Sequence, residues 1–363
     1  MASSLKLLYI EVTHPLKLRD RCLPVMDSNL AAPNSSKKLP LMIAPFFLWG
    51  TAMVAMKGVI PHTQPFFLAT MRLLPAGLLV LLAALLMQRS FQISVRGWLW
   101  ISLFALVDGT LFQGFLAQGL VRTGAGLGSV MIDSQPLAVA LMARWLFDEQ
   151  VGWLGWLGLG VGLLGISLLG LPDAWIVEIF HGHFALSELP EDGLLLVQLL
   201  FNQGEWLMLM AALSMAVGTI LIRYVSAHAD PVVATGWHMV LGGVPLAALS
   251  AGLEAEPWSM VSLGGWGAIA YSTVLGSALA YGIFFWLASK GNLTSLSALT
   301  FLTPVFALLF GNLFLGEVLS PIQTGGVALT IVSIYLINQR DVIMRFLANK
   351  LESATKPSVK PNS

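Results

Sequence analysis

The sequence predicts an all-α membrane protein, with ten transmembrane helices arranged as two inverted repeats of five helices each. Composition gives the first reason: 56% of the 363 residues are hydrophobic and only 10% are charged, whereas about 25% of residues in soluble domains are charged. The mean hydropathy of +0.80 is also typical of membrane proteins. The second reason is that the chain matches itself at one offset, since Gly50-Thr51 recurs as Gly218-Thr219 (218 − 50 = 168).

The repeat is carried by residue types that seldom match by chance in so apolar a chain. The further matches in the same register are Gly97-Trp98 with Gly265-Trp266, Gly114 with Gly282, Pro136 with Pro304, Glu149 with Glu317, and Gly158 with Gly326. A unit with an odd number of helices places its second copy upside down in the membrane. Inverted repeats of this kind are typical of secondary transporters.

Ten apolar stretches are long enough to cross the hydrocarbon layer, which takes about 20 helical residues. They lie at about 39–59, 65–87, 97–119, 125–147, 151–170, 205–225, 231–252, 263–288, 294–315 and 321–339. Each is apolar on all sides and does not alternate with polar residues, so helices are predicted and not barrel strands.

The spans divide the chain into five parts. These are a disordered cytoplasmic tail (1–38), repeat 1 (39–170), an extracytoplasmic insert (171–204), repeat 2 (205–339) and a basic cytoplasmic tail (340–363). With the N-terminus in the cytoplasm, Arg122 is the only Lys or Arg expected on the opposite side. This bias predicts that both termini are cytoplasmic. A cell or inner membrane is the expected location, with the chloroplast envelope as the alternative.

The insert and the tails contain few residues that predict a metal, disulfide or cofactor site. The insert is expected to hold an amphipathic helix lying on the outer face. Its His181 and His183 raise the alternative of a metal or proton-sensing site. Because they lack a carboxylate at metal-binding spacing, no metal site is predicted and solvated histidines on a surface helix are expected. Cys22 is the only cysteine, which excludes an internal disulfide. No cofactor and no nucleic-acid partner are expected, and no nucleotide-binding loop is present.

Ionisable side chains inside the spans are the main site candidates, because a charge in hydrocarbon costs a few kcal/mol. They are Lys57, Arg72, Asp108, Asp133 and His238. Arg72 and His238 occupy matching depths in spans two and seven, counted from Pro65 and Pro231. One interpretation is a cavity where Arg72 and His238 bind an anion, or where an aspartate carries a proton. The other is a structural salt bridge between Arg72 and Asp108 or Asp133, and Lys57 can also extend to the headgroups.

Aromatic and amide side chains complete the candidate site: Trp49, Gln113, Gln135, Trp237, Tyr271 and Tyr281. Each can equally be a packing residue. Pro136 and Pro304 are predicted to bend spans four and nine, as gating elements or as fixed kinks. Glu149 and Glu317 end these spans and are expected to cap or anchor. Span five is rich in glycine, which predicts close packing on a neighbouring helix, with a homodimer contact as the alternative.

The chain resembles the EamA family of the drug/metabolite transporter superfamily. The resemblance is carried by APFFLWGTAMVAMK (44–57), FFLATMRLLPAGLL (66–79), QPLAVALMARWLFDEQ (135–150) and ALTFLTPVFALLFGNLFLGEVLSPIQTGGVALTIVSIYLI (298–337). It covers nearly all of 39–339, and the second half is similar to members from photosynthetic bacteria and chloroplasts. It implies ten helices, export or exchange of small metabolites, and a central cavity formed mostly by spans one to four and six to nine. Asp133 and the long insert depart from the family pattern.

The sequence therefore predicts a secondary transporter of a small metabolite, with the lipid bilayer around it and protons as a candidate coupling ion. An intramembrane aspartyl enzyme using Asp108 and Asp133 is one alternative. The repeat disfavours it, because the equivalent positions are Gly276 and Phe301. A membrane sensor is the other alternative, but the C-terminal tail is short for an output domain.

Overall fold

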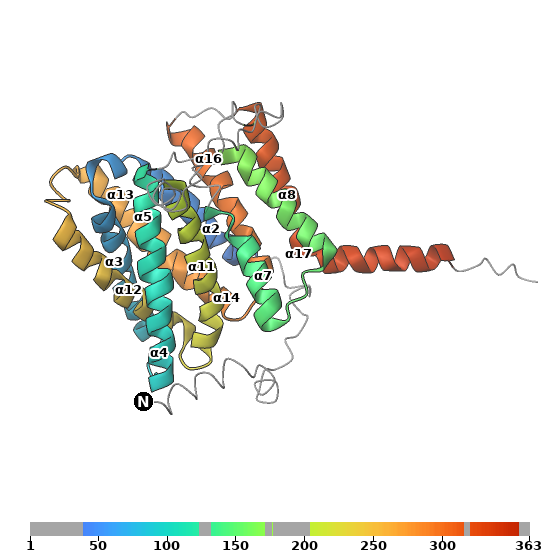
Figure 1. Cartoon of the computed structure of the whole chain (residues 1–363), viewed down its shortest axis with the longest axis horizontal. Helices are drawn as coiled ribbons and strands as arrows, with labels where there is room; N and C mark the ends of the chain where they lie inside the picture. Colours follow the sequence, from blue (N-terminus) through green and yellow to red (C-terminus); the bar gives the residue numbers. More distant parts are fainter. Residues whose placement is uncertain (1–38, 123–131, 171–175, 177–203, 316–319, 356–363) are drawn as a thin grey trace, which may run out of the picture. The chain divides into compact units, whose positions relative to one another are not determined.

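The computed structural model describes residues 39–122, 132–170, 176, 204–315 and 320–355 (Figure 1). All regular secondary structure in these ranges is helical. Eight of these helical stretches are long and apolar enough to cross a membrane, and a shorter apolar helix covers Gly152–Leu168. The predicted span 125–147 is described from residue 132 onward. The N-terminal tail, Glu317 and almost all of the insert, including His181 and His183, lie outside the described residues.

The two repeats contain similar successions of helices. The first contains α2 (Leu39–Lys57), η4 (Ile60–His62), α3 (Pro65–Leu86), α4 (Val95–Phe104), η5 (Ala105–Leu111), α5 (Phe112–Arg122), α7 (Gln135–Phe147) and α8 (Gly152–Gly170). The second contains α11 (Gly204–Ser226), α12 (Pro231–Leu253), α13 (Leu263–Thr273), η7 (Val274–Leu279), α14 (Ala280–Ala288), α15 (Leu293–Ala298), η8 (Leu299–Phe301), α16 (Leu302–Leu315) and α17 (Pro321–Thr355). Seven elements of the first repeat thus have counterparts that begin 165 to 169 residues later, whereas η4, α15 and η8 have no counterpart among the described residues.

The recurring Gly-Trp pairs have a local structural role. Ser94 accepts a hydrogen bond from the backbone N–H of Gly97 at 3.1 Å, and Ser262 accepts one from Gly265 at 3.1 Å. Both serines are therefore N-caps, which satisfy a backbone donor that the helix itself cannot pair. The caps start the third span of each repeat at equivalent positions.

The third span of each repeat widens into a π-helical segment at its middle. Segment η5 follows α4 directly, and η7 follows α13 at the equivalent place. Short π-helical stretches are rare and are frequent at functional sites. Asp108 lies in η5, so the widened turn positions the one acidic residue of that span.

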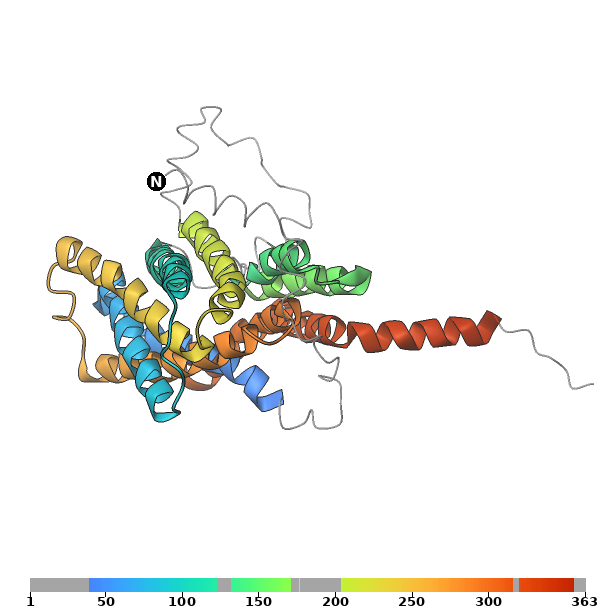
Figure 2. The same ribbon diagram turned by 90° about the horizontal axis from the view of Figure 1, so that it is seen from below.

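Repeat-equivalent helices pack against each other in pairs. The second helices α3 and α12 are one pair, and the fifth helices α8 and α17 are another (Figures 1 and 2). A methyl group on Gly77 of α3 would lie 2.8 Å from the backbone nitrogen of Val240, and one on Gly165 of α8 would lie 2.9 Å from that of Thr330. Glycine is needed at both crossings because the backbones touch.

This packing explains part of the glycine stripe on span five. Gly158 faces Ile337, and Gly165 faces Thr330, so both glycines pack against α17 of the same chain. The expected close packing on a neighbouring helix is therefore present. A homodimer contact at this span stays a prediction.

The two matched prolines each lie in the first turn of an α-helix, inside the span that the sequence predicted. Pro136 lies in the first turn of α7, after a turn at residues 133–134, and Pro304 lies in the first turn of α16, after the 3-10 segment η8. Proline is favoured in a first turn, because its missing N–H would have no helical partner there. Each proline thus lies at the start of an α-helix that follows a turn or a 3-10 segment within the span.

The last helix is longer than the predicted span. Helix α17 continues without a break to Thr355, past the end of the span at residue 339. Residues 340–355 contain neither Gly nor Pro, so no residue in them stops the helix. The first part of the predicted basic tail is therefore helical.

Candidate functional site

Two repeat-equivalent residues, Gln113 and Tyr281, contact each other in the middle of the fold. The Gln113 amide Nε2 donates a hydrogen bond to the Tyr281 hydroxyl at 2.9 Å, and both side chains are buried. A residue that contacts its own repeat mate lies beside the axis that relates the two repeats. The contact between α5 and α14 therefore marks this axis within the helix bundle.

An acid and a base meet next to this contact. His238 Nε2 lies 3.1 Å from Asp108 Oδ2, and both side chains are 0% exposed. His238 Nδ1 lies 2.6 Å from the backbone oxygen of Thr235. The ring also stacks on Phe104, with centroids 4.0 Å apart. These contacts fix the imidazole in position and orientation.

The hydrogen bonds set the proton count of the Asp108–His238 pair. A carbonyl oxygen only accepts, so Nδ1 carries the proton that bonds Thr235. The contact between Nε2 and Oδ2 then holds one proton, placed either on the ring or on the carboxyl group. The pair has no net charge in either arrangement, because one form is imidazolium with carboxylate and the other is neutral on both sides.

Arg72 lies near these groups and makes no hydrogen bond or ion pair with any described residue. Its side chain is buried, interacts electrostatically with Tyr281, and leaves Nε without a hydrogen bond. Asp108 and Tyr281 also interact electrostatically. Arg72 on α3, Asp108 on η5 and Tyr281 on α14 thus converge from three helices.

Trp49 completes the set from α2. Its ring contacts Tyr281 edge to face with centroids 5.2 Å apart, and its indole Nε1 is buried without a partner. We call Trp49, Arg72, Asp108, Gln113, His238 and Tyr281 the axial group. The structure brings these six sequence candidates together.

The other candidates lie in contacts of their own. Gln135 donates to Thr219 Oγ1 at 3.1 Å, and Tyr271 donates to Thr51 Oγ1 at 2.9 Å. Trp237 packs edge to face on Trp98. These three connect neighbouring helices and share no hydrogen bond or ring contact with the axial group in the described structure.

The remaining two candidates, Asp133 and Lys57, are not members of the axial group. Asp133 is buried and has no hydrogen-bond or ion-pair partner among the described residues. The side chain of Lys57 lies outside the described part of the structure.

The alternative interpretation, a structural salt bridge from Arg72 to Asp108 or Asp133, is not formed. Asp108 is bonded to His238, and neither aspartate pairs with Arg72. The two carboxyl groups also form no hydrogen bond to each other, so the aspartate pair that an aspartyl enzyme requires is not formed. The sequence missed the Asp108–His238 pair because depth along a span gives no information on which faces meet.

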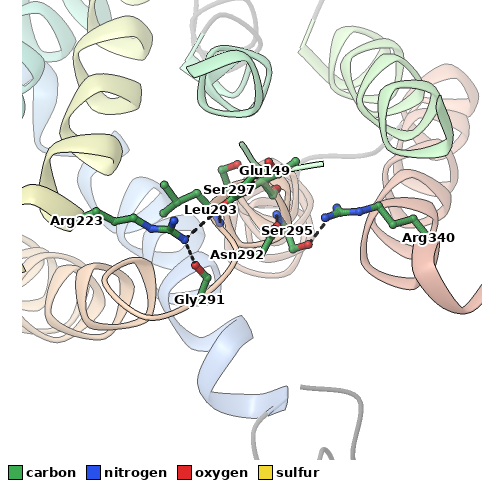
Figure 3. Close-up of polar contacts among 9 residues, drawn as sticks. Glu149, Arg223, Gly291, Asn292, Leu293, Ser295, Ser297 and Arg340 are labelled. Carbon is green, nitrogen blue, oxygen red and sulfur yellow. Dashed lines mark hydrogen bonds and ion pairs between the residues drawn. The ribbon is translucent and has the colours of Figure 1, made fainter. Parts of the chain in front are cut away.

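One end of the bundle is held by Glu149, just after α7 (Figure 3). Its carboxylate accepts from the backbone N–H of Leu293 at 3.1 Å and of Thr294 at 3.3 Å, at the start of α15. It also pairs with Arg223 at 3.1 Å, and Arg223 donates to the backbone oxygen of Gly291. We call this set the Glu149 clamp. The expected capping role of Glu149 is confirmed.

The opposite end of the bundle has a comparable arrangement that sequence reasoning missed. Glu254, just after α12, accepts from the backbone N–H of Phe66 at 2.7 Å and of Phe67 at 2.8 Å, at the start of α3. Ser250 donates to the same carboxylate at 2.7 Å. We call this set the Glu254 clamp. Glu254 is a loop residue with no repeat signal, so only the packing of α12 on α3 reveals its role.

Comparison with known proteins places the chain in a family. The EamA-like transporter family matches residues 36–171 and again 202–339, which are the two repeats. A protein of Synechocystis sp. named an uncharacterized transporter is 60% identical over 318 residues, covering 88% of this chain and 94% of its own length. A WAT1-related chloroplastic protein of Arabidopsis thaliana is 49% identical over 303 residues, covering 82% of this chain and 68% of its own.

More distant matches agree on the fold. Protein PecM of Dickeya dadantii is 28% identical over 303 residues, covering 82% of this chain and 91% of its own. A solved crystal structure superposes with a TM-score of 0.68 at 18% identity, covering 88% of this chain and 99% of the other. At that identity the likeness concerns the fold alone.

Proposed function

The chain belongs to the EamA-like transporter family, and from that premise we propose that it is a secondary transporter of a small metabolite working by alternating access. Its two repeats move against each other, and the axial group is the substrate site. The observation that carries this is the Gln113–Tyr281 hydrogen bond at 2.9 Å between repeat mates. Transporters built from inverted repeats bind substrate at the interface of the repeats.

The closed state of the axial group supports a mechanism that requires opening. Its charged members Arg72, Asp108 and His238 are at most 8% exposed. The Glu149 clamp fastens one end of the bundle, and the Glu254 clamp fastens the other. A substrate reaches the axial group only after one end opens. Releasing one clamp at a time gives alternating access.

We also propose protons as the coupling ion, with the Asp108–His238 pair as the carrier. The pair holds one proton between Oδ2 and Nε2, and its other carboxyl oxygen, Oδ1, has no partner. The cell membrane with both termini in the cytoplasm is the proposed location. The chloroplast envelope is the alternative that the Arabidopsis relative favours.

Flux through purified protein in proteoliposomes tests this function. Radiolabelled amino acids, nucleosides and organic acids are offered with and without a pH gradient, to the wild type and to a Gln113→Leu, Tyr281→Phe variant. We expect selective flux that the variant loses, while Gly282→Ala keeps it, because a methyl group there meets nothing within 4 Å. Folded wild-type protein that moves none of these solutes would contradict the proposal.

A further inference from the structure

The unpaired polar atoms of the axial group are mainly hydrogen-bond donors. Trp49 Nε1 and Arg72 Nε are buried without partners. Tyr281 accepts from Gln113, and its own O–H donates to no other described residue. An indole N–H and a guanidinium can only donate. Three helices thus present donors that the protein itself does not satisfy.

The charges of the axial group do not balance. The Asp108–His238 pair is neutral, because one proton lies between Nε2 and Oδ2 while Nδ1 donates to Thr235. Arg72 keeps its positive charge in proteins. Among the described residues Asp133 is the other buried acid, and it makes no ion pair with Arg72. Arg72 therefore has no counter-anion in the described part of the chain.

A buried guanidinium without an anion is costly, and so are unpaired buried donors. Both costs are removed by a bound oxyanion, because the guanidinium fork matches the geometry of carboxylate and phosphate groups. The sequence suggested that His238 contacts the anion. The structure instead engages both ring nitrogens of His238 and leaves Trp49 and Tyr281 available.

We propose that the axial group binds a small organic oxyanion, with its oxygen atoms on Arg72, Trp49 Nε1 and the Tyr281 hydroxyl. This inference rests on the proposed transport function and names its substrate class. Asp108 Oδ1 also lacks a hydrogen-bond partner, but it faces the backbone of Gly218 on α11 and is not assigned to the solute. Carboxylates and phosphate monoesters share the required chemistry.

The test uses the full-length protein in proteoliposomes loaded with a soluble metabolite extract, and mass spectrometry identifies what leaves. We expect the solutes that leave to carry a carboxylate or a phosphate group, and their identity distinguishes these two sources. Arg72→Gln should lower their flux at least roughly tenfold, as expected for the loss of a charged hydrogen-bonding group. Arg72→Lys should keep part of the flux, because it retains the charge without the fork.

Conservative variants keep the test valid where Arg72→Gln fails to fold. Trp49→Phe keeps an aromatic side chain and removes the Nε1–H donor together with the pyrrole part of the indole, so it should raise the half-saturation concentration several-fold for the anion. Tyr271→Phe is the matched control, because its hydroxyl bonds Thr51 outside the axial group, and it should leave that concentration unchanged. An amide analogue of the transported anion should be transported at least roughly tenfold more slowly.

The outcomes separate the inference from the function on which it rests. Efflux of neutral or cationic solutes, or equal flux of the anion and its amide, overturns the oxyanion site while transport stands. An unchanged half-saturation concentration in Trp49→Phe also overturns it. Folded protein that releases no solute overturns the transport function and the oxyanion site together.

Discussion

Asp108 packs directly against the backbone of Gly218, the residue that repeats Gly50. A methyl group on Gly218 would lie 2.6 Å from Asp108 Cβ and would also overlap Oδ1. Asp108 points from η5 into α11 and is bonded to His238 on α12. Because Gly218 has no side chain, there is room beside α11 for the Asp108 side chain that bonds His238.

Replacing Gly218 by alanine should disturb this pair. We expect a loss of about 1–3 kcal/mol in the free energy of unfolding, which is typical of overpacking, together with loss of flux. Thermal unfolding in detergent and flux in proteoliposomes measure the two effects. Gly282→Ala is the control in open space, and there the expected change is neutral or stabilising by up to about 1 kcal/mol. Equal behaviour of both variants would contradict the packing argument.

Asp108→Asn and Asp108→Ala should differ strongly. The asparagine amide can donate to His238 Nε2 in place of the shared proton, so folding should be nearly preserved. The alanine variant leaves the buried ring nitrogen without a partner and should cost about 3–5 kcal/mol. Flux through the asparagine variant should no longer respond to a pH gradient. A response equal to that of the wild type would remove the pair from the coupling step.

The Gln113–Tyr281 contact should show coupling between its two members. Tyr281→Phe leaves the buried Gln113 amide without its acceptor and should cost about 1–3 kcal/mol. The double variant Gln113→Leu, Tyr281→Phe should cost less than the sum of the two single changes, since neither polar group is left unpaired. Unfolding midpoints of the four proteins give the coupling energy. Strict additivity would mean that the hydrogen bond contributes nothing.

Loss of the Glu149 carboxylate should weaken one end of the bundle. Glu149→Ala removes the cap of α15 and the partner of Arg223, so we expect a cost of about 0.5–2 kcal/mol. Gln150→Ala is the neighbouring control, because its side chain is exposed and such changes stay within about 0.5 kcal/mol. Hydrogen exchange at Leu293 and Thr294 should rise only in the first variant. Unchanged exchange there would argue against the cap.

Much of the fold could be predicted from the sequence, because span length and apolar composition are read directly from the residues. The repeat also predicted that Gln113 and Tyr281 are equivalent, although it did not show that they touch. The π-helical segments around Asp108 and Gly276 could not be foreseen, since no local residue pattern distinguishes them from an ordinary helix. The positions of Pro136 and Pro304 within spans four and nine are visible in the sequence, but the turn or 3-10 segment that precedes each proline is not.

The candidate site was harder to predict than the fold. Arg72 and Asp108 carry opposite charges inside the membrane, so pairing them was the natural hypothesis. In the structure, the rotation of η5 about its axis directs the Asp108 side chain toward His238 and Gly218, so the salt bridge to Arg72 does not form. Glu254 shows the same limit at the bundle end, since a loop glutamate becomes a cap only through the packing of α12 on α3.

The central claim is that the residues at the repeat axis form a site that opens to each side in turn. Because Cys22 is the only cysteine, Gln113→Cys in a Cys22→Ser background places a single reporter thiol at this axis. A membrane-impermeant maleimide applied to either face of the membrane should label it slowly, and a transported solute should slow the labelling further. Labelling from one face only, or no labelling in folded protein, would contradict alternating access to this site.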